Sequence, residues 1–192
     1  STSSGFSFNL PGNPTKFQTS QDTIKHILKE NSIEKLKTWL VNASVEDRHF
    51  ALRAACDNES SFDCLRFLLL KTKPEDNGIN ILARSKYSLQ CAMHRAIRSG
   101  SSVIVGTMLE SNINESPEIL RQLFVKDKNN LTPMDYLVEI KDYDNFPSIL
   151  KTIYDAVKQH QQNEQLALSA DDFNLIKEKI SMLSRAAPSL LM

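Results

Sequence analysis

The chain has 192 residues, of which 41% are hydrophobic and 24% are charged, an ordinary composition for a folded protein. Its 23 basic side chains balance its 23 acidic ones, so the total charge gives no electrostatic reason to expect binding to nucleic acid or to an anionic membrane. No apolar run approaches the roughly 18 residues that a membrane-spanning helix needs, and we expect no membrane insertion. Three cysteines, an odd number, argue against a disulfide framework and favour a reducing, cytoplasmic setting.

Short segments with helical periodicity begin near Asp22. Residues 1–21 are rich in Ser, Gly, Pro, Asn and Thr and have no helical period, which predicts an extended or disordered lead-in. Apolar side chains then recur at helical spacing over 24–28 and over 33–40, and only Asn31-Ser32 separates the two runs. Because the break is so short, we expect the two helices to form an antiparallel pair.

Three further pairs of short apolar faces follow, at 50–55 with 64–69, at 93–97 with 104–109, and at 134–138 with 149–157. Strand-like alternation is nearly absent, which predicts an all-α fold. Hairpins of this length cannot bury their apolar faces alone. We therefore expect about four helix pairs to stack as a solenoid with one continuous core.

The most explicit turn chemistry lies in KDKNNLTPMDYL, residues 126–137. Asparagine tolerates a left-handed backbone, so Asn129-Asn130 can close a tight turn. Thr132 can then cap a helix that begins at Pro133, a position that needs no N–H group. Asp135, three residues after the cap, completes an acidic variant of the capping box. The sequence therefore predicts a helix start at Pro133.

These segments resemble the ankyrin repeat family, whose repeat contains a turn ending in Asp-x-x-Gly-x-Thr-Pro-Leu-His, an Ala-Ala pair and a Gly-His break. DKNNLTPMDY at 127–136 matches the turn, with Asn130 in the glycine place and Asp135 in the histidine place. CAMHRAIRSGSSVIVGTML at 91–109 keeps the histidine and the glycine but lacks the capping Thr-Pro. Equivalent positions are about eight residues further apart than the family's period of about 33, which predicts irregular inter-repeat loops.

The resemblance implies an ankyrin-like solenoid over about 22–157, followed by a linker and a C-terminal helix at 158–192. Ser169 can cap this last helix, whose apolar face would dock on the fourth pair as the end cover that a solenoid needs. The alternative is that the helix, with the apolar end PSLLM, reaches a partner or a further domain.

Residues that could carry catalysis or hold a metal form no recognised constellation. Cys91 and His94 lie three apart on one predicted helix, as a Cys-His nucleophile pair could, but no third orienting group is visible in the sequence. The same residues with Cys56 and Cys64 lack the close Cys-x-x-Cys spacing of zinc sites, and the glycines do not cluster into a phosphate-binding loop. We expect no enzymatic activity, no metal and no cofactor.

Binding to another protein is the function that the resemblance implies, because ankyrin-type proteins usually hold partners by their turn tips and by exposed positions of the first helices. Arginine and tyrosine are also the side chains that most often carry binding energy at interfaces. An ordinary solvated surface is the alternative. Mapped onto this chain, the predicted partner-contact residues are Arg53, Lys86, Tyr87, Arg95, Arg98, Lys128, Asn129 and Tyr136.

Two biological settings stay open at this point, and so does one alternative function. A glycine-poor chain rich in Asn, Lys and Ile is similar in composition to secreted effectors of intracellular bacterial pathogens, which act in the host cytoplasm. An ordinary eukaryotic cytosolic or nuclear adaptor is the alternative setting. The alternative function is that of a regulatory or targeting domain of a larger enzyme, with the catalytic part outside these residues.

Overall fold

The computed structural model describes residues 16–71, 78–110, 118–164 and 167–185. Every regular element within these residues is a helix, so the expected all-α class is confirmed. In chain order, with η marking 3₁₀-helices, the elements are α1 (Lys16–Glu30), α2 (Ile33–Val41), α3 (Val45–Ala55), η1 (Glu59–Ser61), α4 (Phe62–Leu69), α5 (Ala92–Arg98), α6 (Ser102–Met108), η3 (Leu120–Phe124), α8 (Pro133–Tyr136), η4 (Leu137–Ile140), α9 (Phe146–Gln161) and α10 (Ala170–Ser184).

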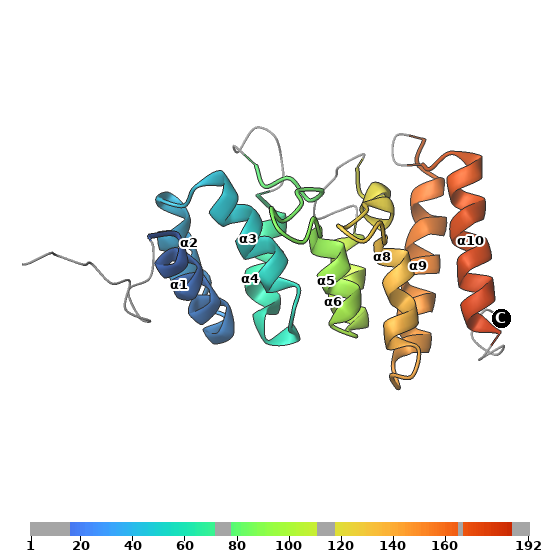
Figure 1. The fold of residues 1–192 in the computed structure, drawn as a ribbon, viewed down its shortest axis with the longest axis horizontal. Coiled ribbons are helices and arrows are strands. Elements are labelled where there is room, and N and C mark those ends of the chain that lie inside the picture. Colours follow the sequence, from blue (N-terminus) through green and yellow to red (C-terminus); the bar gives the residue numbers. More distant parts are fainter. Residues whose placement is uncertain (1–15, 72–77, 111–117, 165–166, 186–192) are drawn as a thin grey trace, which may run out of the picture.

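The helices stand side by side in a row, from α1 and α2 at one end to α10 at the other (Figure 1). In one layer α1 packs against α3, α3 against α5 and α5 against α8, while in the second layer α2 packs against α4, α4 against α6 and α6 against α9. The layers meet where α1 contacts α2, α3 contacts α4 and α5 contacts α6. Each helix pair is therefore covered by the next.

One cluster of buried side chains runs through the whole row, from Ile24 on α1 to Ile180 on α10. Burying a Leu or Ile side chain contributes roughly 1.5–3 kcal/mol relative to leaving it in water. The helices need this contribution, because α5 and α6 have only 7 residues each, too few to be stable alone in water. Packing between neighbouring pairs, rather than helix propensity, holds the fold together.

Small polar residues fix the turn within each pair. The Ser32 hydroxyl accepts the amide of Lys35 at 3.3 Å and so caps α2, and the preceding residue, Asn31, has φ +54°. Before α6 the left-handed residue is Gly100, with φ +71°. A Cβ atom at Gly100 would lie 2.6 Å from the Tyr143 ring, so both the backbone and the neighbouring side chain require glycine there. The break expected at Asn31-Ser32 is confirmed, and the glycine kept in 91–109 lies in the turn before α6.

The helix start expected at Pro133 is confirmed. The Thr132 hydroxyl accepts the Asp135 amide at 3.3 Å, and the Asp135 carboxylate accepts the Thr132 amide at 2.8 Å, which completes the capping box. Asn130 has φ +64°, as a tight turn in the glycine place requires. The α-helix itself is short, because after Tyr136 the chain continues as the 3₁₀-helix η4.

Two expected boundaries are wrong. Residues 16–21 are the first turns of α1 and not part of an extended lead-in; residues 1–15 lie outside the described residues. Helix α9 continues through Gln161, beyond Val157, where we expected the repeats to end. Most of the expected inter-repeat insertions, at 72–77 and 111–117, lie outside the described residues, as do residues 186–192.

Helix α10 packs against α9 and closes one end of the row, as the docked interpretation predicts (Figure 1). Ile176 and Ile180 are buried in the common core. Ser169 caps the helix by accepting the Asp172 amide at 3.2 Å. Lys179 forms an ion pair with Asp135, the capping-box residue of α8, so the last helix is tied to the fourth pair by both packing and charge.

The capping box allows a direct test of where the fourth pair begins. Replacing Thr132 with alanine removes the hydroxyl that caps α8, and we expect a loss of about 1 kcal/mol in the free energy of unfolding. Urea denaturation monitored by circular dichroism measures this loss. Thr38→Ala is the matched control, because Thr38 is exposed inside α2 and bonds only the carbonyl of Glu34. Equal losses in the two variants would contradict the assigned cap.

Candidate interaction surfaces

Two of the predicted contact residues on the helices are buried, so their expected exposure is wrong. Arg53 on α3 is 6% exposed, because α3 packs directly against α5, and burial followed by the positive charge of Arg95 lowers the pKa of its guanidinium. Tyr136 on α8 is 2% exposed. Its hydroxyl donates to Asp127 and accepts from the Gln90 side-chain amide at 2.8 Å. The buried Tyr136 therefore links the turn that contains Asp127 to the preceding turn that contains Gln90.

Two further predicted residues are engaged with neighbouring helices. Arg95 on α5 donates its Nε to Asp57 at 2.7 Å and also pairs with that carboxylate through Nη2. Arg98 pairs with Glu139 of η4 at 3.3 Å, and its guanidinium lies 4.8 Å from the centre of the Tyr136 ring. A partner could reach these arginines only in competition with the acids that already hold them.

The four other predicted residues lie on two turn tips that the structure brings together. A backbone bond from Ser85 to Gln90 at 2.8 Å closes the first tip, and a bond from Asp127 to Leu131 at 2.9 Å closes the second. The Lys128 amide then donates to the Ser88 carbonyl at 3.0 Å and joins the two tips. The connections that carry them, 78–91 and 118–132, lie at one edge of the row, opposite the turns within the pairs (Figure 1).

The outer side of the joined tips is basic and carries an exposed aromatic ring. Tyr87 is 82% exposed, the largest value among the exposed large hydrophobic side chains of the described residues. Two further cations, Arg84 and Lys126, are exposed beside the predicted residues, and an Nη atom of Arg84 lies 3.5 Å from the Lys126 carbonyl. We call this set the tip surface; it consists of Arg84, Lys86, Tyr87, Lys126, Lys128 and Asn129. Arg84 stands outside any repeat motif, so the sequence pattern did not single it out.

Asp127 is the acid between these cations, and its carboxylate points inward. One oxygen accepts the amides of Asn129 at 2.8 Å and Leu131 at 2.9 Å, and the other accepts the Tyr136 hydroxyl. Burial alone would raise the pKa of Asp127, but these hydrogen bonds outweigh it and hold the pKa below its ordinary value. The carboxylate builds the turn instead of pairing with a lysine.

The Cys91 and His94 pair lies inside the core. The His94 Nδ1 accepts the Cys91 amide at 3.1 Å, and its Nε2 donates to the Leu131 carbonyl at 2.9 Å, so both ring nitrogens have structural partners. Burial raises the pKa of the Cys91 thiol and lowers the pKa of His94, which disfavours the thiolate–imidazolium form that a nucleophile needs. The arrangement supports the turn beside α5 and leaves the sulfur without access for a substrate.

The other cysteines are also buried and free. Burial raises the pKa of Cys56, and it raises the pKa of Cys64 to about 11, so both thiols stay protonated at neutral pH. Within the part of the chain that the structure describes, no three His, Cys, Asp or Glu side chains gather closely enough to hold a metal ion.

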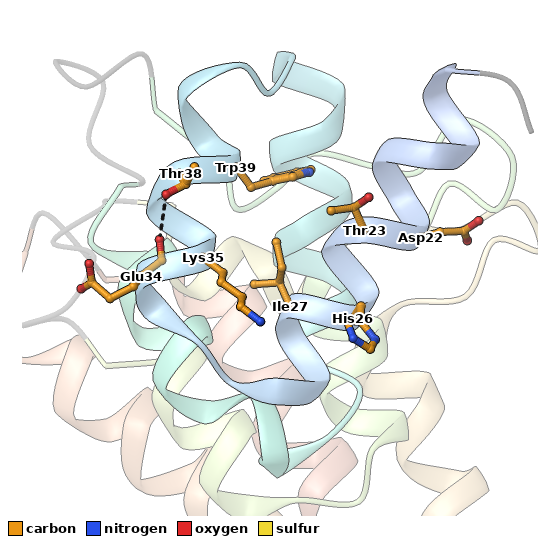
Figure 2. Close-up of a pocket in the computed structure, with 8 residues that line it drawn as sticks. All are labelled: Asp22, Thr23, His26, Ile27, Glu34, Lys35, Thr38 and Trp39. Atoms are coloured by element: carbon orange, nitrogen blue, oxygen red, sulfur yellow. Dashed lines mark hydrogen bonds between the residues drawn. The ribbon is translucent and has the colours of Figure 1, made fainter.

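An open groove of about 850 Å³ lies between α1 and α2 at the first end of the row. Figure 2 shows its lining, with Ile27 and Trp39 facing the space between the two helices. The basic groups at its rim, Lys35 and His26, both pair with Glu30, at 2.6 and 3.2 Å. The groove therefore offers apolar contact, and the basic groups at its rim are already engaged with Glu30. The periodicity assigned Trp39 to a helix face but could not show that it borders an open groove.

Comparison of the chain with protein-family models, with curated proteins and with solved structures found no match.

Among the helices of the described residues, none combines the length and the apolar character that crossing a membrane requires.

The inward carboxylate of Asp127 predicts a specific pH dependence. Asp127→Asn keeps the shape but removes the charge, and we expect it to lower the free energy of unfolding by about 1.5–3 kcal/mol at pH 7. Since the folded-state pKa lies below the unfolded value, this contribution is complete above about pH 5 and disappears as the pH falls through the folded-state pKa. Urea denaturation at several pH values between 7 and 2.5 measures the difference.

The control for this experiment is Asp142→Asn, which changes an exposed carboxylate in a turn at the other edge of the row. It should change stability little at any pH. If Asp127→Asn lowers the free energy of unfolding by the same amount at pH 7 and at pH 2.5, the charge of Asp127 does not stabilise the turn.

Proposed function

We propose that this chain is a non-catalytic protein-binding module, an ankyrin-like solenoid that presents the tip surface to a partner protein. One observation carries the proposal. The tips of two successive units are joined by the bond from Lys128 to Ser88, and together they hold an exposed tyrosine among cations. The capping box at Thr132, the left-handed Asn130 and the two-layer packing of short helices all fit an ankyrin-type repeat.

The tip surface has the physical character of a binding site. An exposed tyrosine offers a large contact area with little conformational entropy to lose, and aromatic anchors of this kind often carry much of an interface's binding energy. The hydrogen bonds within and between the tips fix the backbone before a partner arrives, which lowers the entropic cost of association. The buried free cysteines suit a reducing, cytoplasmic setting, in which we place the module.

The α1–α2 groove is a second apolar surface, but it supports the proposal less directly. Its volume and its apolar residues would accept a partner's side chains.

The tip surface alone is small for an interface. A protein–protein interface of standard size buries about 800 Å² of surface on each partner, and two turns expose less surface than that. We therefore expect the tip surface to act as the centre of a contact that extends onto the neighbouring faces of the row.

Affinity capture from a cell lysate with quantitative mass spectrometry tests this proposal. The baits are the intact chain and the variant Lys86→Ala with Tyr87→Ala. We expect at least one protein to be retained by the intact chain and to be depleted about tenfold or more by the variant, since losing one central aromatic anchor commonly costs more than 1.4 kcal/mol.

The matched control is Lys141→Ala with Tyr143→Ala, which removes the same side-chain types from a turn at the opposite edge of the row. This variant should retain the same proteins as the intact chain. Both variants are compared by thermal denaturation to ensure that they are folded. If the tip variant retains the same set as the intact chain, or if the intact chain retains nothing specifically, the proposal is wrong.

A further inference from the structure

We infer that the tip surface recognises an acidic segment of its partner protein. This inference rests on the proposed function and adds the chemical class of the partner. The segment meant is a stretch of chain in which aspartate or glutamate residues flank at least one apolar side chain. The flanking carboxylates would meet the lysines and arginine of the two tips, and the apolar side chain would pack against the ring of Tyr87.

The first observation is the composition of the two tips. Residues 78–91 contain no aspartate or glutamate but include Arg84 and Lys86. Residues 118–132 contain Asp127 between Lys126 and Lys128, and Glu118, which pairs with Arg121. All four cations of the tip surface are exposed. The carboxylate of Asp127 is turned inward and is held by two backbone amides and the Tyr136 hydroxyl. The outer side of the joined tips is therefore positively charged.

The second observation is that the cations of the tip surface form no ion pair with the described acids. They differ in this from the paired cations Arg95, Arg98, Arg121, Lys35, Lys37, Lys151 and Lys179 and resemble other exposed lysines such as Lys29 and Lys141. Across the ranges that the structure describes, no carboxylate lies within ion-pair distance of Arg84, Lys86, Lys126 or Lys128. The chain as a whole has no net charge, so these cations form a local positive field rather than part of a general one.

The third observation is that the backbone that carries these cations is held in a fixed position. The backbones that carry Lys86 and Lys128 are held together by the bond between Lys128 and Ser88, and each turn is closed by its own backbone bond. Gln90 of the first tip also bonds the tyrosine that supports the second. Cations on a fixed backbone attract a complementary segment at long range and orient it when it binds, which favours both association rate and specificity.

The arrangement fits an acidic peptide better than a nucleic acid. A nucleic-acid backbone is usually bound by a basic track that neutralises many successive phosphates. Here the cations of the tip surface span only two turns, and the arginines on the adjoining helices, Arg95 and Arg98, are already paired with Asp57 and Glu139. A short acidic segment with an apolar residue matches both the extent of the surface and the exposed ring of Tyr87.

Selection from a library of random 12-residue peptides displayed on phage tests the inference with the intact chain as bait. We expect the selected peptides to be enriched in aspartate and glutamate relative to the unselected library. Fluorescence anisotropy then gives the dissociation constant of the strongest labelled peptide, which we expect to rise several-fold between 50 and 300 mM NaCl, because salt screens exposed charges.

Charge reversal supplies the matched variants. Lys86→Glu with Lys128→Glu should weaken binding of the selected peptide at least tenfold. Lys29→Glu with Lys141→Glu makes the same change in net charge on exposed lysines outside the tips, and it should leave the affinity within about threefold. A peptide in which lysine replaces each acid should bind the Lys86→Glu, Lys128→Glu variant better than it binds the intact chain.

The possible failures are distinguishable. Selection of neutral or basic peptides that depend on Tyr87 would contradict the acidic partner but leave the proposed protein-binding function intact. Binding of a 12-residue single-stranded DNA as tightly as the selected peptide, at the same tips, would contradict the inference in favour of a phosphate polymer. If the intact chain enriches no peptides and retains no protein from a lysate, the proposed function itself fails.

Discussion

The carboxylate of Asp127 is the constraint on which the basic tips depend. It accepts two backbone amides and the Tyr136 hydroxyl, and so it holds the turn of the fourth unit in a single shape. Tyr136 in turn bonds Gln90 of the preceding tip, and His94 bonds the carbonyl of Leu131 within the turn. Hydrogen bonds to a charged acceptor are stronger than neutral ones. The acid therefore couples two successive units through hydrogen bonds, in addition to the core that they share.

The inward position of this acid also decides the character of the surface. A carboxylate at the centre of a turn could neutralise the lysines on either side, but here its oxygens are occupied by the backbone and by a buried tyrosine. The same contacts that build the turn thus leave Lys126 and Lys128 without a carboxylate partner among the described residues. The paired arginines on α5 show the opposite arrangement, in which charge is used to fasten one helix to the next.

The sequence predicted the features that depend on local chemistry. Thr132 and Pro133 marked a helix start, and Asn130 marked a left-handed residue, because capping and backbone preference act over a few residues. Burial depends instead on which unit covers a position, so Arg53 and Tyr136 looked like surface residues until the packing of neighbouring helices was known. The sequence also could not predict that the two tips lie close together, because the hydrogen bond between residues 88 and 128 joins segments that share no local pattern. Repeat periodicity can order the units, but it cannot supply the contacts between them.

Amide hydrogen exchange of Lys128 tests most directly whether the tips form one fixed surface. Its N–H group donates to the Ser88 carbonyl, which is the hydrogen bond that would protect this amide on an exposed turn. We predict that this amide exchanges at least about 100-fold more slowly than in an unstructured chain, and that Asp127→Ala removes most of the protection while α9 stays protected. Exchange at the unstructured rate in the intact chain would show that the two tips move independently.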